Sequence, residues 1–206
     1  MGSSTPCSFG SVTVIFGVGL RLPPVRLYRG GEVNRDVENL IFNNVRTPEE
    51  RRGDMRAQVA ANRRGVERLE TLARKYGFER LQDIMSEVRD YSEAMMRQLI
   101  EALPDGEGAF EDFCDGDGII EPGANHDETF TIRLKVTKQG PRLTVDFEGT
   151  DPCVPGPMNA PLSVTSSGVY AALKTALDPK GLVPPNSGAW RAVEVIAPKG
   201  SVVNAE

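Results

Sequence analysis

Residues 47–77 read TPEERRGDMRAQVAANRRGVERLETLARKYG and carry the strongest structural signal in the chain. The stretch opens with Thr47, Pro48 and Glu50, the residue types of a capping box with proline in the first turn. Apolar residues then recur at helical spacing as far as Gly77, a residue type that commonly ends helices. The pattern predicts a helix over residues 48–76, about 43 Å long.

A second helical pattern follows at once. Residues 78–103 carry apolar side chains three or four positions apart, and Pro104 and Gly106 end the pattern. Because only Gly77 separates the two patterns, we expect a long antiparallel helical hairpin over about residues 47–103.

The flanking sequence predicts strands and further helices. Residues 129–137 and 142–147 alternate between apolar and polar side chains, which predicts a β-hairpin with one buried face at about 129–148. A helix of small residues is expected at about 163–177, with Gly168 allowing close packing. Shorter elements are expected as a strand at 11–16, a turn at Gly30 and Gly31, a helix at 35–43 and a strand at 192–196. The fold class is therefore α+β: a helical hairpin, a β-hairpin or small sheet, and a further helix.

Composition narrows the function classes. The chain has 206 residues and a net charge of −5, which disfavours nucleic-acid binding. No apolar run reaches the length of a membrane span, and the first residues lack the basic region of a signal peptide. Cys7, Cys114 and Cys153 lie far apart, which argues against a cysteine zinc site or a disulfide framework. We expect a cytoplasmic protein.

Charge is divided unevenly along the chain. Residues 46–80 hold ten basic side chains against six acidic ones, whereas residues 81–130 hold two against fourteen. Two interpretations are open. The simpler one is that the basic helix and the acidic segment neutralise each other within the fold. The other is that the arginines bind a partner or ligand.

Several residues suggest chemistry only weakly. Asp112, Asp115 and Asp117 resemble part of a calcium loop, but the twelfth position would be Ala124, so a solvated acidic turn is expected. His126 is the only histidine, and we expect it to be exposed. The sequence contains no nucleophile elbow, phosphate-binding loop or dinucleotide fingerprint.

Polar residues form a stripe on the first long helix. Asp54 and Gln58 are four residues apart and share a face, as do Gln58 and Asn62, and Arg56 lies between them. Amide side chains among alanines are unusual for a purely solvated face. The stripe is interpreted either as the lining of a site or channel, or as a solvated or interhelical surface.

Longer segments carry a family resemblance. They lie in the same order as in the family and read GLRLPPVRLY (19–28), NVRTPEE (44–50), GDMRAQVAANR (53–63), LPDG (103–106), VDFEGTDP (145–152), GPMNAP (156–161) and VEVIAP (193–198). Over about residues 18–204 the chain resembles the hydantoinase B/oxoprolinase family, which includes the B-type component of N-methylhydantoinase, the C-terminal half of 5-oxoprolinase and the alpha subunits of acetone carboxylases. Residues 1–17 look atypical for that family.

The resemblance implies an ATP-coupled reaction. A hydantoinase A-type partner subunit would bind ATP and activate a carbonyl by phosphorylation, and the B-type component would act on the intermediate. Cyclic amides are opened by water in the hydantoinases and oxoprolinases, and a ketone is carboxylated in the carboxylases. A divalent metal would suit either reaction.

The family's N-terminal metal-site motifs are absent from this sequence. The resemblance therefore implies an internal fragment of a B-type component, a partial domain of a larger fold. We expect no cofactor to be bound by this chain alone, with ATP on the partner and any metal in the missing region. The candidates for lining a site shared with that region are Asp54, Arg56, Gln58 and Asn159.

The expected function is thus that of a partial B-type component of an ATP-dependent cyclic-amide hydrolase, inactive alone. Three alternatives are kept: a non-catalytic module that docks on an A-type subunit, a component of a ketone carboxylase, and a non-functional remnant.

Overall fold

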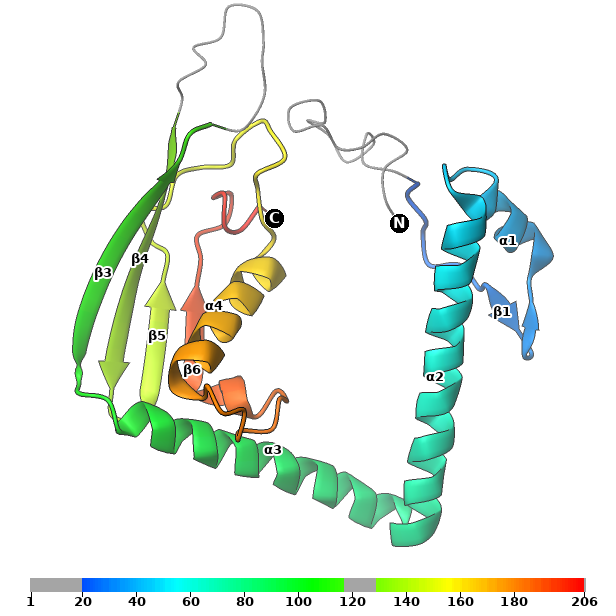
Figure 1. The fold of residues 1–206 in the computed structure, drawn as a ribbon, viewed down its shortest axis with the longest axis horizontal. Coiled ribbons are helices and arrows are strands. Elements are labelled where there is room, and N and C mark those ends of the chain that lie inside the picture. Colours follow the sequence, from blue (N-terminus) through cyan, green and yellow to red (C-terminus); the bar gives the residue numbers. More distant parts are fainter. Residues whose placement is uncertain (1–19, 117–128, 206) are drawn as a thin grey trace, which may run out of the picture. The chain divides into compact units, whose positions relative to one another are not determined.

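The computed structural model describes residues 20–116 and 129–205, which form two compact units. Unit 1 ends at Gly77 and unit 2 begins at Phe78. Each unit is described separately below (Figure 1). The expected strand at 11–16, together with Cys7, Asp117 and His126, lies outside the described residues.

Unit 1 begins with a small hairpin whose turn follows from two glycines. Strand β1 (Tyr28–Arg29) pairs antiparallel with β2 (Glu32–Val33). Gly30 and Gly31 have φ angles of 59° and 89°, in the left-handed region where a tight two-residue turn needs glycine. Helix α1 (Arg35–Phe42) follows directly and buries Ile41 and Phe42. The turn and this helix are confirmed.

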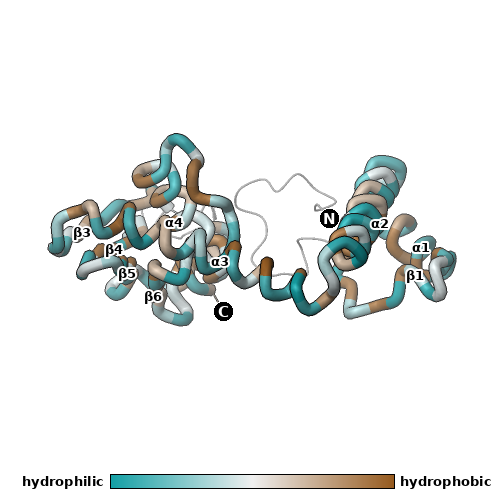
Figure 2. The backbone as a smooth tube through the Cα atoms, turned by 90° about the horizontal axis from the view of Figure 1, so that it is seen from below, coloured by the Kyte–Doolittle hydropathy of each residue, from teal (hydrophilic) through white to brown (hydrophobic). Residues whose placement is uncertain are grey.

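Helix α2 (Pro48–Tyr76) begins and ends where the sequence predicts. One detail of the prediction is wrong: Thr47 makes no side-chain cap, and its hydroxyl oxygen instead accepts a bond from Arg51 Nε at 3.3 Å. None of the residues of α2 is buried, and its tube is drawn mostly in hydrophilic colours (Figure 2). The helix therefore exposes most of its surface within the described part of unit 1.

Unit 2 begins with helix α3 (Phe78–Glu101), which ends two residues before the predicted bound. Ser92, Met96 and Ile100 of this helix have no exposed surface. The antiparallel pairing of α2 with α3 stays a prediction, because the two helices belong to separately described units.

A four-stranded sheet forms the centre of unit 2. Its order is β3 (Gly106–Cys114), β4 (Phe130–Gln139), β5 (Arg142–Asp146) and β6 (Val193–Ile196). The predicted hairpin is the antiparallel β4–β5 pair, and the predicted last strand is β6, which runs parallel to β5. Parallel neighbours need a long crossover, and the segment containing α4 (Leu162–Leu177) supplies it.

Strand β3 was not predicted. It is rich in glycine and acidic residues, and within the described residues none of its side chains is buried. Phe110 and Phe113 are each 65% exposed, so they give no clear alternation of buried and exposed faces. The expected acidic turn is therefore wrong for Asp112, which lies in the strand and pairs with Ile132 of β4.

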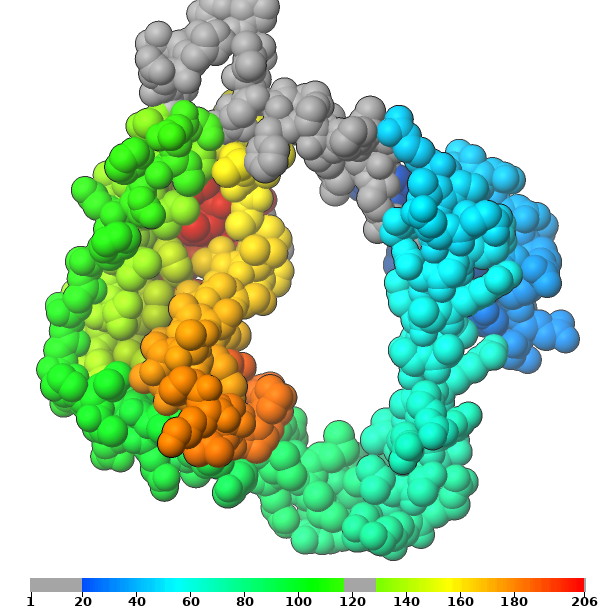
Figure 3. Space-filling model, in the orientation of Figure 1, coloured from blue at the N-terminus to red at the C-terminus, as the bar shows by residue number. Residues whose placement is uncertain are grey.

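Helix α4 covers one face of the sheet (Figure 3). Its expected range is confirmed to within one residue. Tyr170 of α4 stacks on Trp190, with ring centroids 4.4 Å apart. The shared core is made of side chains from α3, α4, β4, β5, β6, the 3₁₀ turn η2 (Ala189–Ala192) and the loop before η2. It includes Met96, Ile100, Leu143, Val183 and Val193.

The segment after β6 completes a second buried cluster of unit 2. Val202 and Val203 are buried against Phe130, Val145 and Phe147. Backbone bonds hold the segment in place, because the amide of Ala160 donates to Val202 O at 2.7 Å and the amide of Cys153 donates to Gly200 O at 2.8 Å. Within the described residues, no helix is long and apolar enough to cross a bilayer.

The described ion pairs join residues of the same unit. In the described structure, the arginines of α2 that form ion pairs do so with carboxylates of unit 1. The acidic residues of α3 and β3 pair with basic residues of unit 2, including Arg133, Lys135 and Arg191. The basic helix and the acidic segment therefore each have ion-pair partners in their own unit, and their neutralisation of each other stays a prediction.

The backbone at Gly188 packs tightly against α3. A Cβ placed there would lie 2.0 Å from the carbonyl oxygen of Arg89 in α3. Gly168, where close packing was expected, behaves differently, because a Cβ there meets no described atom within 4 Å. The expectation for Gly168 is therefore wrong, and the tight contact lies in the loop that precedes η2.

We predict that Gly188→Ala lowers the stability of unit 2 by about 1–3 kcal/mol or more, because the loop must move off α3. Urea unfolding followed by the fluorescence of Trp190, the only tryptophan, measures this. The matched control Gly168→Ala should gain up to about 1 kcal/mol of helix stability. Equal effects of the two substitutions would contradict the packing described.

Asp178 closes the end of α4. Its carboxylate accepts a bond from Lys174 Nζ and from the backbone amides of Leu182 at 2.8 Å and Val183 at 2.9 Å. The bond from Lys174 is the largest cause that lowers the pKa of Asp178 to about 2, and the backbone amides add to it. The ionised carboxylate therefore stabilises the fold.

We predict that Asp178→Asn destabilises unit 2 at neutral pH and that the difference from wild type shrinks under acid. The folded pKa lies below the ordinary 3.8, so the stabilisation is complete above 3.8 and is lost as pH falls towards about 2. Urea midpoints across this range check the trend. The control Asp83→Asn, on the exposed surface of α3, should show no comparable loss at neutral pH.

Candidate functional site

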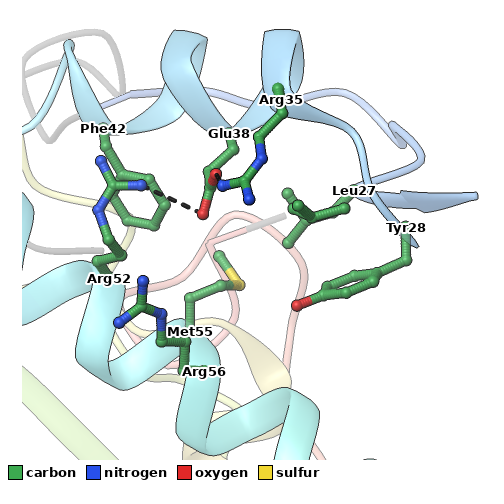
Figure 4. A pocket seen from close by; sticks show the side chains of 9 residues that line it. Leu27, Tyr28, Arg35, Glu38, Phe42, Arg52, Met55 and Arg56 are labelled. Carbon is green, nitrogen blue, oxygen red and sulfur yellow. Dashed lines mark hydrogen bonds and ion pairs between the residues drawn. The ribbon is translucent and has the colours of Figure 1, made fainter. Parts of the chain in front are cut away.

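Unit 1 contains a hollow of about 150 Å³ between its hairpin, α1 and α2 (Figure 4). We call it the Arg56 hollow. Apolar and aromatic side chains line part of it, and charged side chains line the rest. The lining residues are Leu27, Tyr28, Val33, Arg35, Glu38, Phe42, Arg52, Met55 and Arg56.

Glu38 is the only carboxylate among these lining residues, and it is buried. Its oxygens accept a bond from Arg35 Nη1 at 2.8 Å and lie 3.1 Å from Arg52 Nη1. The bond from Arg35 is the main reason that the pKa of Glu38 lies below its ordinary value, with Arg52 contributing. Arg52 also lies 4.3 Å from the centre of the Phe42 ring. Both arginines are therefore held in place.

Arg56 differs from these two arginines. It lines the hollow, but it forms no ion pair or hydrogen bond with the residues that the structure describes. Figure 4 shows its guanidinium beside Met55, on the side of the hollow formed by α2. With three guanidinium groups against one carboxylate, the hollow carries an excess of positive charge.

A groove of about 370 Å³ adjoins the hollow along α2. Tyr28 and Arg56 line both, and Arg63 lies 5.4 Å from the centre of the Tyr28 ring. Arg64, also in the groove, pairs with Glu67 at 3.0 Å. The groove extends the basic surface of the hollow along the helix.

The structure separates the predicted site residues. Asp54 is exposed and pairs with Arg51 at 2.6 Å, and Gln58 is exposed with no described partner. Neither lines the hollow, whereas Arg56 does. Asn62 is also exposed. Within unit 1, the solvated-surface interpretation of the stripe therefore fits Asp54, Gln58 and Asn62.

Asn159 lies in unit 2, where its amide holds the proline-rich loop. Its Oδ1 accepts a bond from the amide of Val154 at 2.9 Å, and its Nδ2 donates to the carbonyls of Val154 at 2.6 Å and Gly156 at 3.0 Å. This side chain fixes loop geometry.

Sequence reasoning missed Arg35, Glu38 and Arg52 as residues that act together. They lie on two helices, and only the folding of α1 onto α2 brings them around one hollow. The available signal was modest: a carboxylate on the same side of a short helix as buried apolar residues.

The described residues do not fit a metal site. Among them, no group of three or more His, Cys, Asp or Glu side chains is arranged to hold a metal ion. Cys114 and Cys153 are free thiols.

Two small units, one helical with a basic hollow and one built on a mixed sheet, define the class of protein as an α+β domain with a candidate anion site. Comparison with known proteins then supplies the family. The sequence profile of the hydantoinase B/oxoprolinase family matches residues 1–206, so the chain belongs to that family. The match includes residues 1–17, which we expected to look atypical.

Individual relatives agree with this assignment. The chain is 38% identical over 211 residues to the B-type component of a putative D-/L-hydantoinase of Pseudomonas sp. (strain NS671), matching 99% of this chain and 35% of that protein. It is 31% identical over 210 residues to the beta chain of the caprolactamase of Pseudomonas jessenii, matching 100% of this chain and 34% of that protein. The chain therefore spans about a third of the length of both relatives.

Solved structures show the same fold. The crystal structure of an ATP-dependent caprolactamase from Pseudomonas jessenii matches with a TM-score of 0.81 at 30% identity, covering 100% of this chain and 34% of that one. A nucleotide-free acetone carboxylase matches with a TM-score of 0.79 at 20% identity, covering 92% and 26%. The second match shows the fold alone. The fold is therefore part of a larger one, as expected.

We predict that Asn159→Ala lowers the stability of unit 2 by about 1–3 kcal/mol, because partly buried backbone groups of the loop lose their partner. Urea unfolding monitored at Trp190 measures the change. Asn62→Ala is the control and is followed by circular dichroism, because Asn62 lies in unit 1 and Trp190 in unit 2. It should be neutral or slightly stabilising because this exposed residue lies within α2. A neutral result for Asn159→Ala would show that its amide is not what holds the loop.

Proposed function

We propose that this chain is a partial B-type component of an ATP-dependent cyclic-amide hydrolase and that it is inactive alone. One observation carries the proposal: the chain belongs to the hydantoinase B/oxoprolinase family over its whole length while spanning about a third of its relatives. A ring amide is favoured as substrate over a ketone, because the relatives at 30% identity or more with named activities are a hydantoinase component and a caprolactamase.

The proposed partner is a hydantoinase A-type subunit that binds ATP. ATP would activate the amide carbonyl on that subunit, and a divalent metal, if the reaction uses one, would be held by regions beyond this sequence. The described residues do not fit such a metal, so it has no step in the proposed reaction of this chain. The free thiols suit a reducing cytoplasm, which is the proposed location.

The residues proposed to line the shared site are Asp54, Arg56, Gln58 and Asn159. Asp54 and Gln58 lie one turn apart on α2 with Arg56 between them in sequence, and Asn159 holds a loop of unit 2. Alanine at each corresponding position in a complete homologous protein tests the assignment. Unchanged turnover in all four variants would contradict the assignment of these residues to the site.

We predict that the purified chain alone hydrolyses no ATP and opens no ring, with hydantoin or 5-oxoproline as substrate and with divalent metal added. Addition of a hydantoinase A-type subunit should yield a stable complex on size-exclusion chromatography. Substrate-dependent ATP hydrolysis by the chain alone would contradict the proposal of a partial component.

The partnered sample separates the remaining alternatives. A folded chain that binds the A-type subunit without turnover fits a docking module, and a chain that neither binds nor turns over is a remnant. Coupled ATP hydrolysis and ring opening by the pair would establish a working site shared between the two chains.

A further inference from the structure

We propose that the Arg56 hollow binds a small organic carboxylate, with the carboxylate on Arg56 and the apolar body against Met55 and Leu27. The site lies wholly within unit 1 and needs no metal or nucleotide. It deepens the proposed function and rests on it in one respect, because it assigns a ligand class to Arg56, which is also proposed to line the shared site.

The hollow has more guanidinium groups than its one carboxylate can pair with. Arg35 and Arg52 both pair with the carboxylate of Glu38, so two of the three guanidinium groups already have an anionic partner. Arg56 stays without an ionic partner among the described residues, and its N–H donors form a planar fork that matches a carboxylate. An anion that enters the hollow therefore meets a free fork and an excess of positive charge.

Shape and polarity select the kind of anion. Four side chains of the hollow are apolar: Leu27, Val33, Phe42 and Met55. A compact inorganic anion would leave this apolar surface uncovered, whereas a carboxylate on a small hydrocarbon body would cover it. A volume of about 150 Å³ is that of a cavity able to hold one benzene ring, which sets the size of the body at about one five- or six-membered ring.

Tyr28 adds a further polar group. Figure 4 shows its ring at the side of the hollow, with the hydroxyl directed inward. Arg63 lies over the same ring from the adjoining groove, which restricts how the ring can turn. A phenolic hydroxyl can donate to the second carboxylate oxygen, so Arg56 and Tyr28 would orient the ligand from two sides.

The ligand class has a chemical link to the reaction, and this link rests on the proposed function. Hydrolysis of a cyclic amide breaks the ring C–N bond and forms a C–O bond from water. The carbonyl carbon leaves as a carboxylate, and the nitrogen takes up a proton as an amine from a lactam or as a ureido N–H from a hydantoin. The product of any such ring opening is therefore a small organic carboxylate. The hollow would hold a molecule of this kind near the chain that forms it.

Binding to the full 206-residue chain tests the proposal, by isothermal titration at low ionic strength. Three probes are used: 5-oxoproline, which carries a carboxylate on a five-membered ring; 2-pyrrolidinone, the same ring without the carboxylate; and inorganic phosphate. We expect saturable binding of 5-oxoproline, with both other probes at least about tenfold weaker. Equal binding of 2-pyrrolidinone, or tighter binding of phosphate, overturns the proposal, as does the absence of 5-oxoproline binding.

Variants then locate the site. Arg56→Gln should weaken 5-oxoproline binding by about tenfold or more, because one charge-assisted pair is lost. Arg68→Gln is the matched control: it removes the same charge from α2 at an exposed position outside the hollow, and binding should stay unchanged. Equal losses in both variants would mean a general effect of net charge and would overturn the assignment to this hollow.

Circular dichroism of each variant confirms that α2 is intact. Because binding needs neither ATP, partner nor turnover, its result is independent of the ring-opening assay. If the chain binds 5-oxoproline through Arg56 but supports no ring opening with its partner, the proposal of this site stands and the proposed function is contradicted. If it supports ring opening but does not bind 5-oxoproline, the proposed function stands and the proposal of this site is contradicted.

Discussion

Burial of one face of α3 is the constraint on which unit 2 depends. Met96 and Ile100 have no exposed surface, and each such side chain contributes about 1.5–3 kcal/mol when it leaves water. The residues that cover them come from β5, β6, η2 and the loop before η2. That loop can approach α3 only because position 188 lacks a side chain. Strands far apart in sequence are thereby brought beside one another, and β6 can pair parallel to β5.

Unit 1 depends on charge to a greater degree. Its long helix buries none of its own residues, and the contact between α1 and α2 is built around Glu38 and the arginines that serve it. A buried carboxylate is tolerated when charged donors satisfy it, and here two do. The same arrangement leaves Arg56 without a described partner beside an apolar surface. Glu38 is paired by Arg35 and Arg52, so Arg56 in the same hollow is left available to bind an anion.

The chain belongs to the hydantoinase B/oxoprolinase family. Its two units correspond to about a third of the length of the relatives that it matches. Large apolar side chains such as Phe110 and Phe113 are exposed on β3.

Local patterns determined much of this protein. Helical spacing and the proline and glycine at its ends set the bounds of α2, alternation revealed the β4–β5 hairpin, and the ordered motifs indicated the family, because each of these signals lies within neighbouring residues. Only the tertiary structure decided the rest. Strand β3 has no buried face, so its sequence lacks the alternation that predicts a strand. Gly188 is critical only because the carbonyl of Arg89, distant in sequence, lies against it. The Arg56 hollow forms only when α1 packs onto α2. Such features depend on contacts between distant segments, which no local pattern encodes.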